Sequence, residues 1–383
     1  MKKWTELVQF DPSPNDPFRA NSTPIYQTAT FAQEIDELNA YDYTRSGNPT
    51  RDVVQQQIAK LEKGQQGFVF NSGMAALTSL MGLLEQGDHV IASRDLYGGT
   101  HRLLSQRLPQ RGITYTLVDT TDIAAVAAVF LPTTRLLLIE TPSNPLQKIS
   151  DIQKLGTLAH ENKAYFAVDN TFLSPWLQKP LLLGADIVIH SATKHLGGHS
   201  DITAGVIVVK DPKIAEKIAF IQNAEGTALA PFECWLLLRG LKTLGLRIER
   251  QQQIATDIAN YLKQHDFIKK VYYPGLIDHP HHDLHFYQAR GAGTVISFET
   301  GSLELSKNII RRVQLFTLSV SFGSLNSLIN LPCAMSHASI PIELRELPAD
   351  LIRLSIGIED AEDLISDLGQ ALQFSAMNNV AIA

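Results

Sequence analysis

The stretch Asp186-Ile-Val-Ile-His-Ser-Ala-Thr-Lys-His-Leu-Gly-Gly-His199 combines a short apolar run with a polar segment that contains a lysine. The apolar part, residues 187–190, has the length and β-branched content of a buried strand. Lys194 lies just past this run, with the hydroxyls of Ser191 and Thr193 nearby in sequence. In open α/β sheets, ligands bind beyond the carboxyl ends of the strands, so Lys194 is a candidate site residue. The alternative is an ordinary solvated loop lysine.

Short apolar runs of the same kind alternate with amphipathic stretches over the first two thirds of the chain. We expect strands at residues 67–70, 89–92, 114–118, 136–140, 165–169, 187–190 and 205–209. Helical stretches lie between most of them, including residues 50–64, 73–84 and 152–161. This alternation predicts an α/β fold with a mostly parallel, seven-stranded sheet and helices on both faces.

The pattern changes after about Pro231. We expect one long helix over residues 233–264, strands at 270–273, 294–298 and 351–355, and helices at 305–313 and 361–371. That order is typical of a smaller α+β domain with an antiparallel sheet. The chain then divides into an extended N-terminal arm (residues 1–48), a larger domain (49–235) and a C-terminal domain (236–383).

Composition narrows the class of protein. The 383 residues carry a formal net charge of −6, which offers no electrostatic reason to bind nucleic acid. The apolar runs are too short to span a bilayer, and no signal-peptide pattern follows the first lysines. Only two cysteines occur, Cys234 and Cys333, so we expect buried thiols without a disulfide framework, in a cytoplasmic protein.

Two further segments carry polar groups at positions suited to a ligand. Residues 71–76 read Asn-Ser-Gly-Met-Ala-Ala and open a helix, whose free N–H groups and dipole favour a phosphate. A simple Ser72 N-cap explains this segment equally well. The strand at 165–169 ends in Asp169.

These segments together match what pyridoxal phosphate (PLP) chemistry requires. It needs a lysine amine for a Schiff base, an acid beside the pyridine nitrogen, a phosphate cradle and a flat group over the ring. The chain supplies them in Lys194, Asp169, Gly73 with Met74, Ser191 with Thr193, and Tyr97.

With these motifs the chain resembles the Cys/Met-metabolism family of PLP enzymes, over residues 24–372. The resemblance implies the fold of aspartate aminotransferase (fold type I), with Lys194, Tyr97 and Asp169 as catalytic residues and Gly73, Met74, Ser191 and Thr193 at the phosphate. It also implies that Asn144, in Glu140-Thr-Pro-Ser-Asn-Pro145, contacts the ring hydroxyl. Tyr43 and Arg45 are expected to reach the phosphate in a neighbouring subunit, which implies a homotetramer built from two dimers.

The same resemblance assigns substrate residues. Arg353 is expected to bind the α-carboxylate, because its guanidinium can donate two parallel hydrogen bonds. Ser321 is expected to place that carboxylate and Lys194, while Arg102 and Asp42 meet the distal end of the substrate. Val320 stands where relatives that act at the γ-carbon carry a glutamate. The resemblance therefore implies a carbon–sulfur lyase that performs β-elimination on cystathionine, with γ-replacement on an acyl-homoserine and γ-elimination left open.

Other interpretations of the sequence are weaker. Ser191 and Lys194 also fit the Ser-x-x-Lys motif of acyl-transferring enzymes. Those enzymes carry two further three-residue motifs, and the nearest stretches of this sequence differ from each of them at the third residue. The histidines at 279, 281, 282 and 285 lack an ordered ligand spacing, so we expect a polar surface loop and no metal site. A non-catalytic binding protein with the same fold is disfavoured, because a binder needs no electron sink.

Overall fold

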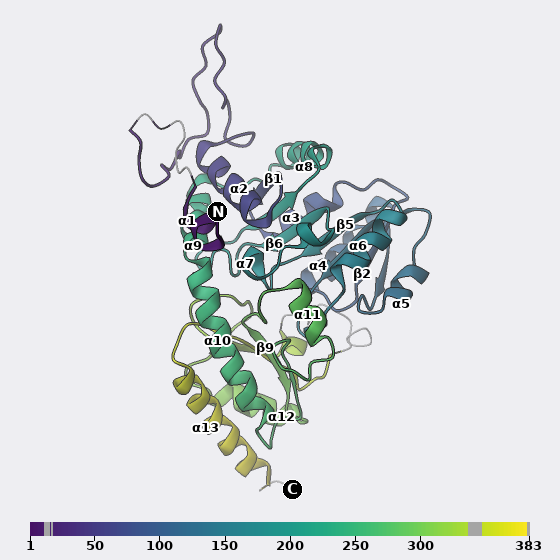
Figure 1. The fold of residues 1–383 in the computed structure, drawn as a ribbon, viewed down its shortest axis with the longest axis vertical. Coiled ribbons are helices and arrows are strands. Elements are labelled where there is room, and N and C mark those ends of the chain that lie inside the picture. Colours follow the sequence, from purple (N-terminus) through teal and green to yellow (C-terminus); the bar gives the residue numbers. More distant parts are fainter. Residues whose placement is uncertain (11–15, 17, 336–346, 381–383) are drawn as a thin grey trace.

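The computed structural model describes residues 1–10, 16, 18–335 and 347–380. Its larger part is a seven-stranded sheet of order β1-β7-β6-β5-β4-β2-β3 (Figure 1), in which only β7 runs against the other strands. The predicted mostly parallel sheet of seven strands is confirmed. The strands are β1 (Gln66–Phe70), β2 (His89–Ser93), β3 (Thr114–Val118), β4 (Thr134–Glu140), β5 (Tyr165–Asp169), β6 (Ile187–Ser191) and β7 (Gly205–Val209).

Helices cover both faces of this sheet, which explains its continuous apolar strands. Successive residues of β4 alternate between two cores: Leu137 and Ile139 face one, and Leu136 and Leu138 the other. The first core is closed mainly by α2 (Pro49–Glu62), α6 (Ile152–Glu161), α7 (Ser174–Leu177) and α9 (Pro231–Lys242), and the second by α3 (Gly73–Met81) and α8 (Pro212–Glu225). Shorter helices are α4 (Gly98–Arg102) and α5 (Ile123–Ala128).

The C-terminal part is a five-stranded sheet of order β10-β11-β12-β9-β8, packed against α10 (Leu244–Lys263), α12 (Leu303–Arg312) and α13 (Ala361–Val380). The strands are β8 (Lys270–Tyr272), β9 (Val295–Glu299), β10 (Thr317–Leu318), β11 (Leu328–Asn330) and β12 (Ile352–Ser355). All pairs are antiparallel except β10 with β11. The three-residue strand β8 was predicted, but β10 and β11, of two and three residues, were not, because runs this short carry little periodicity.

The expected single helix over residues 233–264 is wrong. The chain forms two helices, α9 and α10, which meet at Thr243, whose φ of −107° and ψ of 3° are not helical. Gly240 passes so close to the segment after β6 that a Cβ would lie 2.3 Å from the carbonyl oxygen of Gly197. The first half of α10 packs in the large core and the second half in the small one, so we propose that the domain division runs through α10.

The N-terminal arm is only partly extended. Residues Lys3–Val8 form helix α1, and Leu7 is buried in the large core of the chain itself. Residues 28–44 stand away from the body as a narrow loop (Figure 1), held by an antiparallel bridge between Thr30 and Tyr43. Among the described residues, no helix has the length and apolar character needed to cross a membrane.

Arg247 joins the two helices to the lysine-bearing segment. This buried side chain donates hydrogen bonds to the carbonyl oxygens of Gly240 and His195, both at 2.8 Å, and to the Thr243 hydroxyl at 3.1 Å. Burial lowers the pKa of the guanidinium to about 10, so it remains charged at neutral pH.

We expect Arg247→Met to lower the free energy of unfolding by about 2–4 kcal/mol, because buried carbonyl groups lose a charged donor. Urea denaturation followed by circular dichroism measures this. The matched control is Arg250→Met on the same helix, whose exposed pair with Asp360 should be worth less than about 1 kcal/mol. Equal losses in both variants would contradict the assigned role.

Candidate active site

A cavity of about 580 Å³ lies at the carboxyl ends of β4, β5 and β6, within the usual size range of small-molecule sites. It brings together most of the predicted site residues: Gly73, Met74, Tyr97, Arg102, Asn144, Asp169, Ser191, Thr193, Lys194, Val320, Ser321 and Arg353. A larger cavity of about 740 Å³, lined in part by Lys148, Tyr272 and His279, contains none of them. The chemistry of the lining therefore identifies the site, and the size of the cavity does not.

Lys194 joins the two domains across this cavity. Its amine donates to the hydroxyl of Ser321 at 2.5 Å and lies 5.3 Å from the ring centroid of Phe322. Burial, with the positive charge of Arg353 as the smaller cause, lowers the pKa of Lys194 from 10.5 to about 8. A substantial fraction of the amine is therefore neutral near physiological pH, as a nucleophile or proton acceptor requires.

The backbone of Ser321 is held in an unusual conformation. Its φ of 93° is rare for a residue with a side chain, and such strain persists only where the surroundings impose it. Here Arg353 donates to the Ser321 carbonyl at 2.9 Å, while the Ser321 hydroxyl accepts from Lys194. The strain thus serves to present the hydroxyl to the lysine.

Arg353 is a buried cation at the cavity wall, with a side chain only 2% exposed. It donates to the side-chain oxygen of Asn144 at 2.8 Å, and its Nε is buried without a hydrogen-bond partner. Burial lowers the pKa of Arg353 to about 10, which leaves it charged. A buried charge that is bonded only to neutral oxygens is stabilised when an anion enters, so this position suits a carboxylate.

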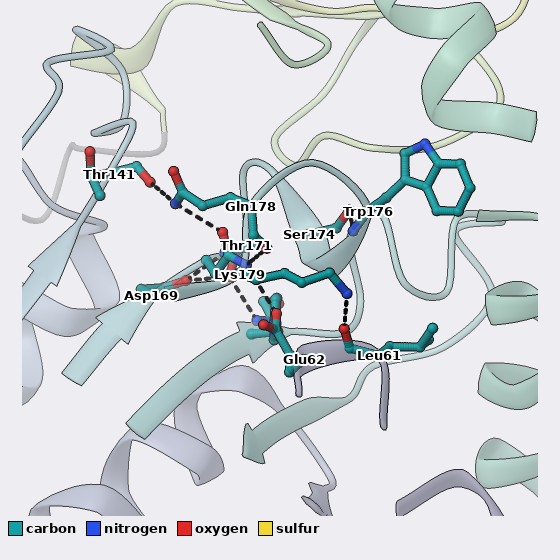
Figure 2. A network of polar contacts seen from close by, with 12 residues as sticks. Leu61, Glu62, Thr141, Asp169, Thr171, Ser174, Trp176, Gln178 and Lys179 are labelled. Atoms are coloured by element: carbon teal, nitrogen blue, oxygen red, sulfur yellow. Dashed lines mark hydrogen bonds and ion pairs between the residues drawn. The ribbon is translucent and has the colours of Figure 1, made fainter. Parts of the chain in front are cut away.

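Asp169 ends β5 beneath the cavity, where the hydroxyl and backbone N–H of Thr171 donate to its Oδ1. Burial raises the pKa of this carboxyl, because its charged form is poorly solvated there. A cationic partner beside it would stabilise that charged form. Behind it lies a buried network around Glu62 (Figure 2), whose side chain accepts from Asn170 at 3.0 Å and pairs with His190 at 2.6 Å. The network therefore holds Asn170, which follows Asp169, and His190, which precedes Ser191.

The network continues on the other side of Asn170. The side-chain amide of Gln178 donates to the Asn170 side chain at 3.1 Å and to the carbonyl oxygen of Thr141 at 3.0 Å (Figure 2). Thr141 directly follows Glu140, the last residue of β4. The ends of β4, β5 and β6 are therefore held together by side chains as well as by the sheet.

The start of α3 forms another wall. Ser72 caps the helix by accepting from the N–H of Ala75 at 3.0 Å, and the first N–H groups of a helix have no partner within it. Gly73 allows this end to approach β6, because a Cβ would lie 3.0 Å from the Cβ of Ser191. The expected phosphate residues on α3 and after β6 are thus neighbours.

Three of the predicted residues do not line this cavity. Asp42, Tyr43 and Arg45 are exposed on the arm, and Arg45 donates to the carbonyl oxygen of Asn223 on α8 at 3.2 Å. Their predicted place in a neighbouring subunit stays a prediction. Sequence reasoning also missed two residues, Glu140 and Thr171, which both line the cavity.

The alternative sites are not supported by the geometry. A Ser-x-x-Lys site would require a contact between Lys194 and Ser191. The amine of Lys194 instead donates to Ser321. The histidine segment is not simply a surface loop: α11 spans His282–Gln288, and His285 is fully buried with Nε2 at 2.8 Å from the Gly291 carbonyl. Within the described ranges, no three His, Cys, Asp or Glu side chains are grouped as metal ligands.

Comparison with known proteins agrees with this site. Residues 4–373 match the family of Cys/Met metabolism PLP-dependent enzymes. The chain is 54% identical over 373 residues to the chloroplastic cystathionine beta-lyase of Arabidopsis thaliana (96% of this chain, 80% of the relative). It is 50% identical to the cystathionine beta-lyase of Neurospora crassa (96% and 81%). A solved structure of cystathionine gamma-lyase from Lactobacillus plantarum, complexed with L-serine, superposes with a TM-score of 0.95 at 45% identity (97% and 99%).

The chain therefore belongs to the family of Cys/Met metabolism PLP-dependent enzymes, and its cofactor is PLP. The residues present fit that group. Lys194 offers a partly neutral amine, Asp169 a carboxyl that favours a cationic partner, and Gly73 with Ser191 a crowded helix start suited to a phosphate.

The lowered pKa of Lys194 can be tested on the cofactor-free protein. We expect acetylation of Lys194 to rise with a midpoint near pH 8, because its neutral amine appears there and not near pH 10.5. Competitive labelling read by peptide mass spectrometry measures this midpoint. Arg353→Met should move the midpoint upward, because a neighbouring positive charge is removed.

The complementary experiment loads the protein with PLP and reduces it with borohydride. The modified peptide should contain Lys194, and Lys194→Ala should lose the covalent link. Reduction that fixes the cofactor to another lysine would refute this assignment.

Proposed function

We propose that this protein catalyses β-elimination of L-cystathionine with water, which yields homocysteine, pyruvate and ammonia. The observation that carries the choice of reaction is the apolar wall formed by Val320 and Phe322 beside Ser321. The names of the Arabidopsis and Neurospora relatives support it.

The roles of the residues follow from their positions. When bound, PLP supplies an electron sink for the electrons released at the substrate α-carbon. Arg353 binds the α-carboxylate, and Asp169 holds a proton at the pyridine nitrogen. Lys194, oriented by Ser321, accepts the α-proton at Nζ.

Val320 and Phe322 decide which substrate bond is placed for cleavage. Phe322 is 6% exposed and packs on Phe172 with ring centroids 4.6 Å apart, so its ring is held in place, whereas Val320 is 50% exposed. A carboxylate at position 320 would pair with the distal ammonium of cystathionine and bring the γ-carbon forward. With valine there, that pose sets the ammonium against an apolar side chain that offers it no partner, which is unfavourable. The bond between the β-carbon and the sulfur is then the one aligned for cleavage.

We further propose a homotetramer of two tight dimers in the cytoplasm. Tyr43 and Arg45 are exposed on the projecting arm, outside the cavity of their own chain, which supports a role in a neighbouring site. Neither Cys234 nor Cys333 forms a disulfide, as is usual in a reducing compartment.

With L-cystathionine we expect pyruvate and homocysteine as main products, and 2-oxobutyrate and cysteine as minor ones. Chromatography of the quenched reaction identifies all four. A predominance of 2-oxobutyrate would establish γ-elimination instead, and rapid replacement of an acyl-homoserine substituent by cysteine would establish γ-replacement.

Val320→Glu provides the matched test of the wall. It should raise the share of 2-oxobutyrate, because the new carboxylate offers the distal ammonium a partner. Val320→Gln, which has the same length without the charge, should leave the product ratio close to that of the unmodified protein.

The shared site can be tested by mixing inactive subunits. Lys194→Ala and a Tyr43→Ala, Arg45→Ala double variant should each lose most activity alone. Mixed dimers contain one intact site, so activity should return after the two are unfolded and refolded together. Light scattering should give a tetramer, and a fully active monomer would contradict the assembly.

A further inference from the structure

Glu140 is a buried carboxyl in the cavity to which neither the sequence nor the family resemblance assigned a role. It ends β4, where its register partner on β5 is Asp169. The residue is 8% exposed and lines the same cavity as Lys194.

The carboxyl contacts the segment that carries Tyr97. Its Oε2 accepts the backbone N–H of Tyr97 at 3.0 Å. Tyr97 immediately precedes α4, and its side chain makes no capping hydrogen bond with that helix. Its ring is 43% exposed at the cavity, so the ring receives little fixation from packing. The bond to Glu140 therefore anchors the backbone from which the ring projects.

Charges around Glu140 come from three other segments. Burial, then the neighbouring Asp169 on β5, raises the pKa of Glu140 well above its ordinary value, and Asp95 contributes in the same direction. The Tyr97 N–H and the Arg353 guanidinium on β12 act against this rise. Two ionised carboxylates on paired strand ends in a buried site are unfavourable, so burial and Asp169 both favour the protonated form of Glu140.

We propose that Glu140 is a positioning residue of the cofactor site, which holds Tyr97 over the cavity by accepting its backbone N–H at the strand end beside Asp169. The inference rests on the proposed use of Lys194, Asp169 and Tyr97 to hold PLP. It implies that a neutral acceptor of the same shape replaces Glu140 without loss.

Three proteins separate these roles: the unmodified chain, Glu140→Gln and Glu140→Ala. Glutamine keeps an oxygen acceptor of the same reach and carries no charge, whereas alanine leaves the Tyr97 N–H without a partner. The readouts are the apparent Kd for PLP, from titration of cofactor-free protein, and the pH profile of the absorbance of the bound cofactor. Both are independent of cystathionine, so a different reaction product would leave this result intact.

We expect Glu140→Gln to bind PLP within about twofold of the unmodified chain, with the same spectral pH profile. Glu140→Ala should bind PLP about 5–30-fold more weakly, as expected for one buried hydrogen-bond partner lost. Full-strength binding by Glu140→Ala would overturn the proposal. So would a shifted pH profile in Glu140→Gln, which would show that an ionised carboxylate is needed. The glutamine variant keeps the test decisive even if the alanine variant does not fold.

Glu299 supplies a matched control. It also ends a strand, β9, is 7% exposed, and accepts a hydrogen bond from a tyrosine, through the Tyr272 hydroxyl. It lies outside this cavity. Glu299→Ala should lower the melting temperature while the Kd for PLP and the spectral profile stay unchanged. An equal loss of PLP affinity in this variant would show a general effect of burial and would count against a positioning role for Glu140.

Discussion

The buried guanidinium of Arg353 is the constraint around which the cavity is organised. It belongs to β12 in the C-terminal domain, yet it bonds to Asn144 in the segment after β4 of the larger domain. Through the carbonyl of Ser321 it also holds the residue whose hydroxyl orients Lys194. A buried cation with only neutral hydrogen-bond partners is costly to maintain, and the cost is offset when a carboxylate arrives. Substrate binding and alignment of the lysine are thus linked through one side chain.

The same cavity also carries two neighbouring carboxyl groups. Asp169 and Glu140 end adjacent strands, and burial raises the pKa of both. Such a pair is unfavourable unless one member holds a proton or a cation lies beside it. The Glu62–His190 pair and the Asn170–Glu62 hydrogen bond help to hold the ends of β5 and β6 in place behind them. Preorganised groups of this kind favour a bound cation over water.

The helix junction at Thr243 lies where α9 of the larger domain meets α10, which packs in both cores. Gly240 lets α9 approach the segment after Lys194, and Arg247 bonds to both sides of that contact. The same segment that bears the lysine is therefore fixed to the hinge between the domains. The lysine-bearing segment is thus held from the α10 side by Arg247 and from the C-terminal domain by Ser321.

The sequence by itself determined the sheet, the class of cofactor and the residues at strand ends, because each depends on local order along the chain. Lys194 lies just past an apolar run and Asp169 ends another, and Gly73 opens a helix after a third such run. Ser321 and Arg353 were assigned only through family resemblance, since nothing local marks them. Only the tertiary structure placed Glu140 beside Asp169 and Arg247 across the helix break, because strand register and helix packing bring together residues that are far apart in sequence. The pKa shifts of Lys194 and Glu140 also depend on the tertiary structure. Their main cause is burial, which cannot be read from the local sequence.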